Sequence, residues 1–331
     1  MRKYANCGTG TINYLSSTIC DEFISIISKE LQLTIVNEIK EAKFYSLIID
    51  STPDISHVDQ LIVIIRYVLP SGIKERILRF LPIFSHTGEK LEKVILEFLN
   101  NIDLDITNCR GQSYDNAFNM SERIDASNKT LQQKDESLNT AVLIYDSLID
   151  FIQTVRDNFD NLEKEAEKVK DIAYTNDKKR HKIRKLFHDE IPEHEIRFSG
   201  KEHFKANVFF VVCDSLISNI KKRSDGYKTI NNKFKTIFHD SDVSDSSIKE
   251  LKCYEQDLNL TELKNEVLQF KTFLSKENII SPVSMWSFIQ ENNIISTFPN
   301  LNIILRIYLT LPISNASGER SFSVMARIKN F

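Results

Sequence analysis

The stretch that most constrains the fold is Phe44–Asp54 (FYSLIIDSTPD), which is followed closely by a second apolar run over Leu61–Val68. Its first half is a continuous run of apolar and aromatic residues with high β-propensity, and its second half consists of turn residues. This pattern predicts a buried strand that ends at Asp50. A carboxylate at such a strand end is held rigidly and reaches solvent, as a metal-binding catalytic acid must. An ordinary turn aspartate fits the same pattern.

The residues around this strand predict a mixed sheet. Apolar positions at helical spacing over residues 14–43 predict one or two amphipathic helices that lead into it. The turn at Pro70–Gly72 predicts an antiparallel hairpin between the second apolar run and a third strand over Glu75–Phe84. Because Pro82 cannot donate a ladder hydrogen bond, we expect the third strand at the edge of the sheet.

A second acidic residue also follows a predicted strand. A helix capped by Thr87 over residues 87–100 leads to a fourth strand over residues 106–113, and Asp115 comes directly after that strand's end. If the first and fourth strands are parallel neighbours, Asp50 and Asp115 project from the same edge of the sheet. Two carboxylates close together at that edge would hold one or two hard divalent ions through oxygen ligands.

The chain from about residue 125 onward predicts an all-α second half. Ser199 and Glu202 have the spacing of a capping box, and the polar run over residues 239–247 predicts an exposed loop. The segments with helical periodicity are residues 136–169, 199–219, 261–276, 282–292 and 299–310, and a last helix follows Pro312 with Glu319, Phe322, Met325 and Ile328 directed inward.

Two features of this half allow both a structural and a functional interpretation. Glu319 lies in the first turn of the last predicted helix, where it suits the helix dipole or serves as a catalytic acid. The basic run DKKRHKIRK over residues 177–185 is a solvated linker, or a patch for nuclear import or phosphate contact. Its cationic residues are Lys178, Lys179, Arg180, Lys182, Arg184 and Lys185.

Composition excludes several classes of protein. The net charge of −3 gives no global attraction to nucleic acid, so any DNA contact must be local. The 5 cysteines show no CxxC or CxxH spacing, and we expect neither a disulfide framework nor a zinc site. No glycine-rich phosphate loop is present. No apolar run approaches the roughly 20 residues of a membrane span, and the N-terminus lacks a secretory signal, so an intracellular protein is expected.

Three segments, taken together, resemble the hAT superfamily of DNA transposases, and within it the transposon-derived proteins labelled MYM-type zinc-finger-like. They are FYSLIIDSTPDISHVDQLIVIIRYV, CRGQSYDNAFNMS and FPNLNIILRIYLTLPISNASGERSFSVMARIKNF, and they occur in the family's order. The pattern LPISNASGERSFS is the most specific, because it is similar to the hAT C-terminal dimerisation region.

The resemblance implies an α/β plus α fold, in which an RNase H-like mixed sheet is interrupted by a large all-helical insertion. It implies an Asp–Asp–Glu triad that binds Mg²⁺ or Mn²⁺, which motif matching assigns to Asp50, Asp115 and Glu319. It also implies a nuclear homodimer. We expect domains at residues 1–43, 44–124, 125–297 and 298–331, the last being the dimerisation region. Its candidate dimerisation residues are Leu305, Tyr308, Leu309, Phe322 and Met325.

The chain departs from the family pattern after the second acid. No cysteine or histidine occurs between Cys109 and His181, so the family's CxxH segment and the fifth strand that it forms are expected to be missing. A sheet without that strand leaves ladder groups unpaired, at a cost of several kcal/mol. No zinc-finger DNA reader precedes residue 15, and the resemblance therefore points to a decayed or partial copy.

These departures favour a catalytically inactive hAT transposase-derived protein that retains dimerisation, without membrane or small-molecule partners. The alternative is an active divalent-metal-dependent DNA transposase or nuclease, which needs another segment, such as residues 137–144, to replace the strand. A third hypothesis is a nuclear DNA-binding protein that uses Lys178–Lys185. Outside the nucleus, the cytoplasm is the expected compartment.

Overall fold

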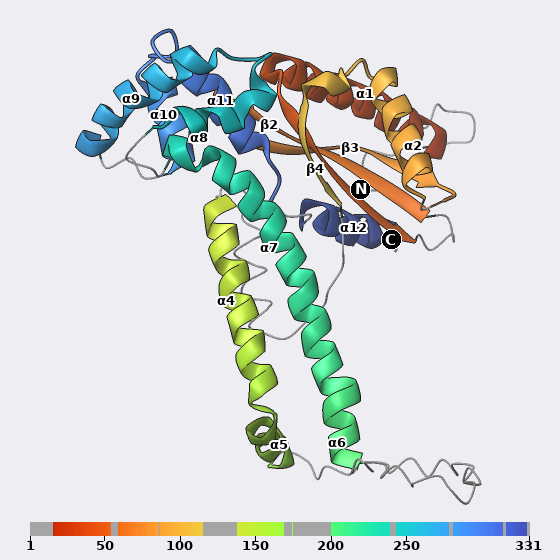
Figure 1. The fold of residues 1–331 in the computed structure, drawn as a ribbon. Coiled ribbons are helices and arrows are strands. Elements are labelled where there is room, and N and C mark those ends of the chain that lie inside the picture. Colours follow the sequence, from red (N-terminus) through yellow and green to blue (C-terminus); the bar gives the residue numbers. More distant parts are fainter. Residues whose placement is uncertain are drawn as a thin grey trace, which may run out of the picture. The chain divides into compact units, whose positions relative to one another are not determined.

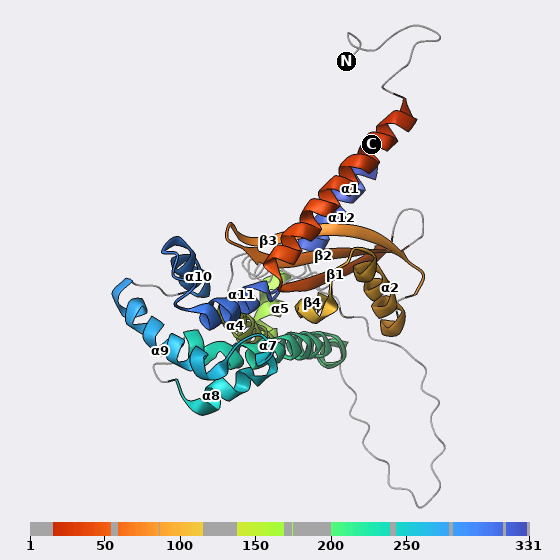
Figure 2. The same ribbon diagram turned by 90° about the horizontal axis from the view of Figure 1, so that it is seen from above.

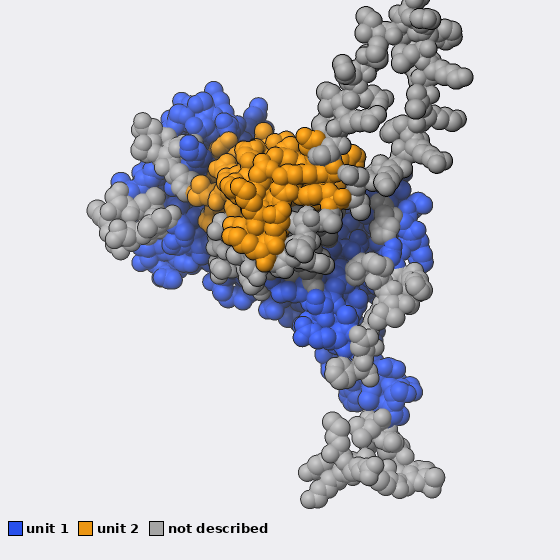
Figure 3. Space-filling view, turned by 90° about the horizontal axis from the view of Figure 1, so that it is seen from below, with its two compact units in different colours: residues 1–137, 233–331 blue, residues 138–232 orange. Residues whose placement is uncertain are grey.

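A computed structural model describes the fold of the chain (Figure 1). The described residues are 16–53, 59–85, 87–114, 138–168, 174, 200–238, 243–277, 281–313 and 316–329. They divide into two compact units, which are coloured separately in Figure 3. Unit 1 comprises residues 1–137 and 233–331, and unit 2 comprises residues 138–232. Each unit is described by itself. The four domain boundaries expected from the sequence stay predictions.

Unit 1 is built around a four-stranded mixed sheet with the order β3-β2-β1-β4. Its strands are β1 (Tyr45–Pro53), β2 (Asp59–Leu69), β3 (Gly72–Ile83) and β4 (Cys109–Tyr114). β1 and β2 pair antiparallel, as do β2 and β3, whereas β1 and β4 pair parallel. The predicted hairpin and the edge position of the third strand are confirmed, and the first and fourth strands pair parallel, which is the condition for Asp50 and Asp115 to share one edge.

The two faces of the sheet are covered by different helices (Figure 1). Alternate residues of β1, Tyr45, Leu47 and Ile49, share a buried cluster with α1 (Ser17–Ala42) and α2 (Gly88–Asn101). Ile48 points the other way, because successive side chains of a strand alternate. It belongs to a second cluster that includes Phe322 of α12 (Ala316–Lys329). Asp50 has the same parity as Ile48 and therefore lies on the α12 side of the sheet.

Helices from the C-terminal third complete unit 1. They are α8 (Asp245–Lys249), α9 (Leu260–Glu277), α10 (Pro282–Glu291) and α11 (Pro299–Thr310), together with the short helix η3 (Glu250–Tyr254) and the end of α7 (Phe210–Phe238). α11 packs against α9, α10 and β2. The helices predicted at 261–276, 282–292 and 299–310 are confirmed within one residue at each end.

Unit 2 is a helical unit made from two distant stretches of the chain. Its elements are α4 (Leu138–Asp157), α5 (Phe159–Glu167), α6 (Gly200–Phe204), the π-helical turn η2 (Lys205–Phe209) and α7 as far as Asn232. Tyr145 of α4 stacks on Tyr227 of α7 with ring centroids 5.6 Å apart. Ser224 donates a hydrogen bond to Asp146 at 2.9 Å, which satisfies a buried hydroxyl in this helix pair.

Several local predictions differ from the structure. β1 does not end at Asp50 but continues to Pro53, and the helical segment expected over residues 136–169 contains two helices, α4 and α5. Thr87 occupies the N-cap position of α2 but makes no side-chain capping hydrogen bond. The fourth strand begins at Cys109 because Asp105 accepts a hydrogen bond from the Thr107 amide at 2.9 Å and starts a 3-10 turn, η1 (Ile106–Asn108). The loop expected over residues 239–247 is wrong in part, since Ser244 caps α8 and Val243 is buried.

One buried ion pair connects the hairpin with the last two helices. Arg66 of β2 and Glu75 of β3 lie opposite each other, 2.6 Å apart, with side chains only 4% and 8% exposed. Arg66 also donates through Nε to the carbonyl oxygen of Leu309, at the end of α11, at 3.0 Å. Glu75 accepts a hydrogen bond from the Ser317 hydroxyl of α12. We call these four residues the Arg66 network.

Replacing Arg66 by Met should destabilise unit 1 by about 3–5 kcal/mol, because the Glu75 carboxylate is then left buried without its counter-ion. Denaturant unfolding followed by the fluorescence of Trp286, the chain's one tryptophan and a buried residue of unit 1, measures the change. Lys93→Met is the matched control, since its ion pair with Glu97 is exposed. Equal midpoints for the two variants would contradict the importance of the network.

Candidate functional site

Asp50 lies on β1, directly beneath the first turn of α12. Asp50 is only 5% exposed. A Cβ built on Gly318 would lie 2.7 Å from Cβ and 2.8 Å from Oδ2 of Asp50, so no side chain larger than hydrogen fits there without a shift. The free amide groups and the dipole at a helix N-terminus favour a carboxylate at this place. The carboxylate of Asp50 therefore lies close to the first turn of α12.

The two other predicted acids are described less fully. Asp115 lies outside the described residues, directly after the end of β4. The parallel register pairs Ile49 with Tyr114, so Asp50 and Asp115 each follow a paired residue. Glu319 follows Gly318 in α12, but the structure describes only its backbone. The parallel strand pairing that the triad requires is present, and the triad itself stays a prediction.

The described donors do not form a metal site. Mg²⁺ and Mn²⁺ prefer about six oxygen ligands in an open, hydrated shell. Among the described residues, no group of three histidine, cysteine, aspartate or glutamate side chains is placed to hold a metal ion. Asp50, the one predicted ligand whose side chain is described, is a buried carboxylate against the backbone of α12. The side chains of the other two predicted ligands lie outside the described residues, so the metal site stays a prediction and no chemical step is assigned to an ion.

The Arg66 network holds α12 over Asp50. Ser317 precedes Gly318 and donates its hydroxyl to Glu75, while Arg320 donates to the Ser317 hydroxyl at 3.1 Å. Sequence reasoning placed Arg66 inside an apolar strand and gave it no role. The detectable feature was a lone arginine in the run QLIVIIRYV, because a charged residue in a strand buried on both faces requires a partner.

The candidate dimerisation residues fall into two groups. Leu305, Tyr308 and Leu309 of α11 are buried within unit 1. On α12, Phe322 is half-buried and packs edge-on against Phe80 with ring centroids 5.6 Å apart, and Met325 is also half-buried. Ile328, which was expected to face inward, is 69% exposed, so that expectation is wrong. Val324 on the same side of the helix is also exposed.

The N-terminus of α11 is capped by a carboxylate from another helix. Phe298 at the N-cap position supplies no side-chain hydrogen bond. Glu266 of α9 instead accepts from the Leu301 amide at 2.8 Å, the Asn300 amide at 3.2 Å and the Asn300 side-chain nitrogen at 2.6 Å. Two otherwise unpaired helix N–H groups are thereby satisfied. Glu266 was also missed by sequence reasoning, since its partners lie more than 30 residues along the chain.

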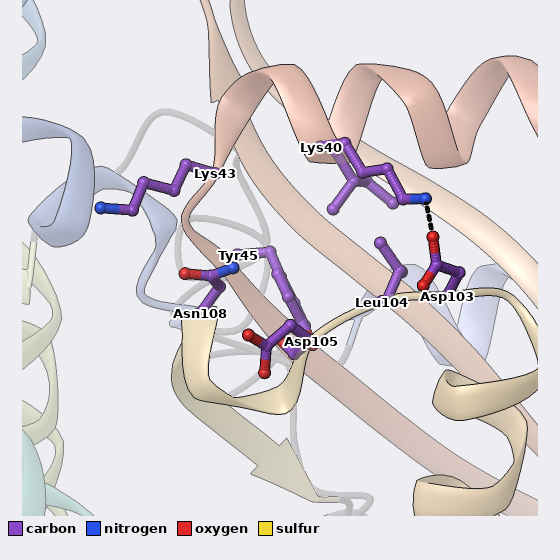
Figure 4. A pocket seen from close by; sticks show the side chains of 8 residues that line it. Lys40, Lys43, Tyr45, Asp103, Leu104, Asp105 and Asn108 are labelled. Carbon is purple, nitrogen blue, oxygen red and sulfur yellow. Dashed lines mark hydrogen bonds and ion pairs between the residues drawn. The ribbon is translucent and has the colours of Figure 1, made fainter.

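A pocket of about 190 Å³ lies at the opposite end of β1 from Asp50 (Figure 4). Tyr45 donates to the Asp105 carbonyl oxygen there at 3.1 Å, and burial raises the pKa of the Tyr45 phenol. Hydrogen bonds from Thr107 lower the pKa of the Asp105 carboxyl. Lys40 is paired with Asp103. Two lysines, Lys40 and Lys43, and two aspartates, Asp103 and Asp105, line the pocket. Its charge therefore favours neither anionic nor cationic ligands, and we assign no ligand to it.

The predicted patch for nuclear import or phosphate contact stays a prediction. The basic run with Lys178, Lys179, Arg180, Lys182, Arg184 and Lys185 lies outside the described residues. Within the described residues, no helix is long and apolar enough to cross a membrane.

A mixed sheet with helices on both faces, completed by helices from the C-terminal end of the chain, defines an α/β protein with a helical C-terminal region. Comparison with known families agrees with both parts. Residues 3–126 match the family described as ZMYM1/FAM200, RNase-like domain. Residues 260–330 match the hAT family C-terminal dimerisation region. The two matches, taken together, are those of a hAT-derived, ZMYM-like protein.

Gly318→Ala should loosen α12 from the sheet, because the new methyl group meets the side chain of Asp50 within 3 Å. We expect a loss of about 1–3 kcal/mol, typical of overpacking, together with faster proteolysis after residue 313. Gly88→Ala is the control, since nothing lies within 4 Å of a Cβ there. A Gly318→Ala variant as stable and protease-resistant as the control would rule out the close approach.

Glu266→Ala should destabilise unit 1 by roughly 1–3 kcal/mol, because it removes the acceptor for the first amide groups of α11. Glu266→Gln should lose less, since it keeps one carbonyl oxygen. The control is Glu262→Ala, whose carboxylate is exposed and contacts Asn300 at only 3.4 Å. Thermal unfolding monitored by circular dichroism gives the ranking, and equal losses for Glu266→Ala and Glu262→Ala would refute it.

Proposed function

We propose that this chain is a catalytically inactive, hAT transposase-derived protein whose remaining activity is self-association through its C-terminal region. The observation that carries the proposal is the burial of Asp50 under Gly318 of α12. In a metal-dependent nuclease the first carboxylate must face a hydrated ion. Here the same carboxylate faces a helix and contributes to the packing of α12 on the sheet.

The C-terminal region supports the second half of the proposal. The match to the hAT dimerisation region covers residues 260–330, which include α9, α10, α11 and α12. Leu305, Tyr308 and Leu309 of α11 are buried within unit 1, so we assign them to the support of this region. The surface that faces a second copy is then expected on α12, where Val324 and Ile328 are exposed beside the half-buried Phe322 and Met325.

An active transposase or nuclease is the second candidate. The observation that favours it is the parallel pairing of β1 and β4, in which Ile49 lies opposite Tyr114, and these are the residues that precede Asp50 and Asp115. This candidate requires α12 to move away from Asp50, so that the carboxylate can bind Mg²⁺ or Mn²⁺. The family suggests a nuclear location for either candidate, and DNA would be the substrate of the second.

Metal dependence separates the two candidates. We expect the thermal midpoint of the intact chain to be unchanged by 5 mM manganese, taken as roughly a saturating concentration for a functional site, since an ion that binds only the folded state must raise its stability. Supercoiled plasmid should not be nicked under the same conditions. A manganese-dependent rise in the midpoint and nicking, both lost in Asp50→Asn, would establish the enzyme and overturn the inactive assignment.

Self-association is tested by sedimentation velocity over a concentration series. The intact chain should form dimers, and Val324→Glu combined with Ile328→Glu should raise the dissociation constant at least tenfold, because two buried carboxylates at an interface are left unpaired. Ala326→Glu is the control, because Ala326 is exposed on the opposite side of α12 from Val324 and Ile328. A strictly monomeric intact chain would refute the proposed function.

A further inference from the structure

The outer edge of β3 is an open strand edge in the part of the chain that the structure describes. β3 is the last strand on its side of the sheet and pairs with β2 alone among the described strands. Figure 2 shows it on the side of the sheet away from β4. Along such an edge, every second residue points its backbone N–H and C=O groups away from the sheet, where another strand can pair with them.

Two features that hinder the pairing of a further strand lie in the second half of β3. The register of β3 on β2 shifts at Leu78, which is the extra residue of a β-bulge. Pro82 follows in the same half and cannot donate a backbone hydrogen bond. The first half, Ile73–Ile77, pairs with β2 in an unbroken register, and its length is close to that of a typical strand. This stretch is therefore the part of the edge that suits the addition of another strand.

Three cations project from one face of this edge, because they lie opposite β2 residues of the buried cluster that includes α1. They are Lys74, which is half-buried, and the exposed Arg76 and Arg79. Among the described residues none of the three forms an ion pair, although Arg76 contacts the Tyr67 hydroxyl. The one carboxylate of β3, Glu75, faces the other way and is paired with Arg66. The edge therefore carries positive charge that no neighbouring carboxylate compensates.

The opposite face of the same edge is apolar. Ile77 is 43% exposed, and its β2 partner Ile64 belongs to the cluster on the α12 side of the sheet. Ile73 is half-buried and shares this face, because residues an even number of positions apart in a strand lie on the same face. An incoming strand would meet positive charge with one set of alternate side chains and isoleucine with the other.

We propose that the Ile73–Ile77 edge binds an extended, acidic segment of a partner protein, which adds to the sheet as a further strand. Backbone hydrogen bonds to β3 hold the segment, and its alternate carboxylates face Lys74 and Arg76. The side chains between those carboxylates are apolar and pack on Ile77. The charge of the edge and the alternation of its two faces together define this partner.

Two other occupants fit the edge less well. A second copy of the chain that paired through its own β3 would place cations opposite cations on the same face, which is unfavourable. A nucleic acid would meet the cations with its phosphate groups but would leave the backbone groups of the edge without a strand to pair with. The inference goes beyond the proposed function, because it requires neither a second copy nor the exposed side chains of α12.

The test measures the binding of labelled peptides to the intact chain by fluorescence anisotropy. The probe is a short peptide that alternates glutamate and valine. One comparison peptide has lysine in place of glutamate, and another keeps the sequence but carries N-methyl groups on its backbone amides, so that it retains its charge and cannot pair as a strand. We expect only the unmodified glutamate peptide to bind. Hydrogen exchange of residues 73–77 should slow when it does.

Matched variants of the chain locate the binding site. Lys74→Gln with Arg79→Gln removes two charges from the edge, and Lys221→Gln with Lys222→Gln removes the same charge from exposed positions of α7. None of these side chains forms an ion pair within the described part of the chain, so thermal midpoints should match that of the unmodified chain. We expect about fivefold weaker peptide binding for the edge variant, from the loss of two exposed ion pairs, and no loss for the α7 variant.

Several outcomes would overturn the inference. Equal binding of the N-methylated peptide would mean that charge alone attracts the probe, and equal binding by the edge variant would place the site elsewhere. Protection of residues 73–77 in dilute protein without peptide would mean that the chain covers its own edge. If duplex DNA binds instead of the peptide, and the edge variant loses that binding, the cations contact phosphate groups. Dimerisation is measured separately by sedimentation velocity, so failure of either proposal leaves the other standing.

Discussion

The ion pair between Arg66 and Glu75 is the constraint on which the arrangement of unit 1 depends. A guanidinium and a carboxylate that are each less than a tenth exposed persist only if their remaining donors and acceptors are satisfied. The end of α11 and the start of α12 supply those partners, through the Leu309 carbonyl and the Ser317 hydroxyl. The pair thus makes the hairpin and the last two helices interdependent, although 243 residues separate Arg66 from Leu309.

Much of the sheet could be predicted from the sequence, because local patterns determine it. The run around Ile49, the Pro70–Gly72 turn and Pro82 indicated a central strand, a hairpin and an edge strand, and the structure has all three. The contacts that make the candidate site could not be predicted in this way. They depend on which residues meet in space, and Gly318 meets Asp50 only because α12 is held across the sheet.

Periodicity was also an incomplete guide to the helices. It placed α1 correctly but could not show that the helix contacts the sheet only through Ile35, Val36, Ile39 and Ala42. It likewise marked Leu305, Tyr308 and Leu309 as an apolar stripe, which an interface and a core share. Only their burial on several sides, with Glu266 closing the start of α11, indicates that they serve the core.

The position of Asp50 connects this packing to the question of activity. A carboxylate that binds a hydrated ion must reach the water around that ion, whereas Asp50 is only 5% exposed and lies against the first turn of α12. The Arg66 network holds that turn on the sheet through the hydrogen bond from Ser317 to Glu75. In the inactive protein that we propose, burial of Asp50 and a firmly held C-terminal helix are two results of one contact. A dimerising protein benefits from that contact, since a rigid α12 presents its exposed apolar side chains without the entropic cost of ordering them.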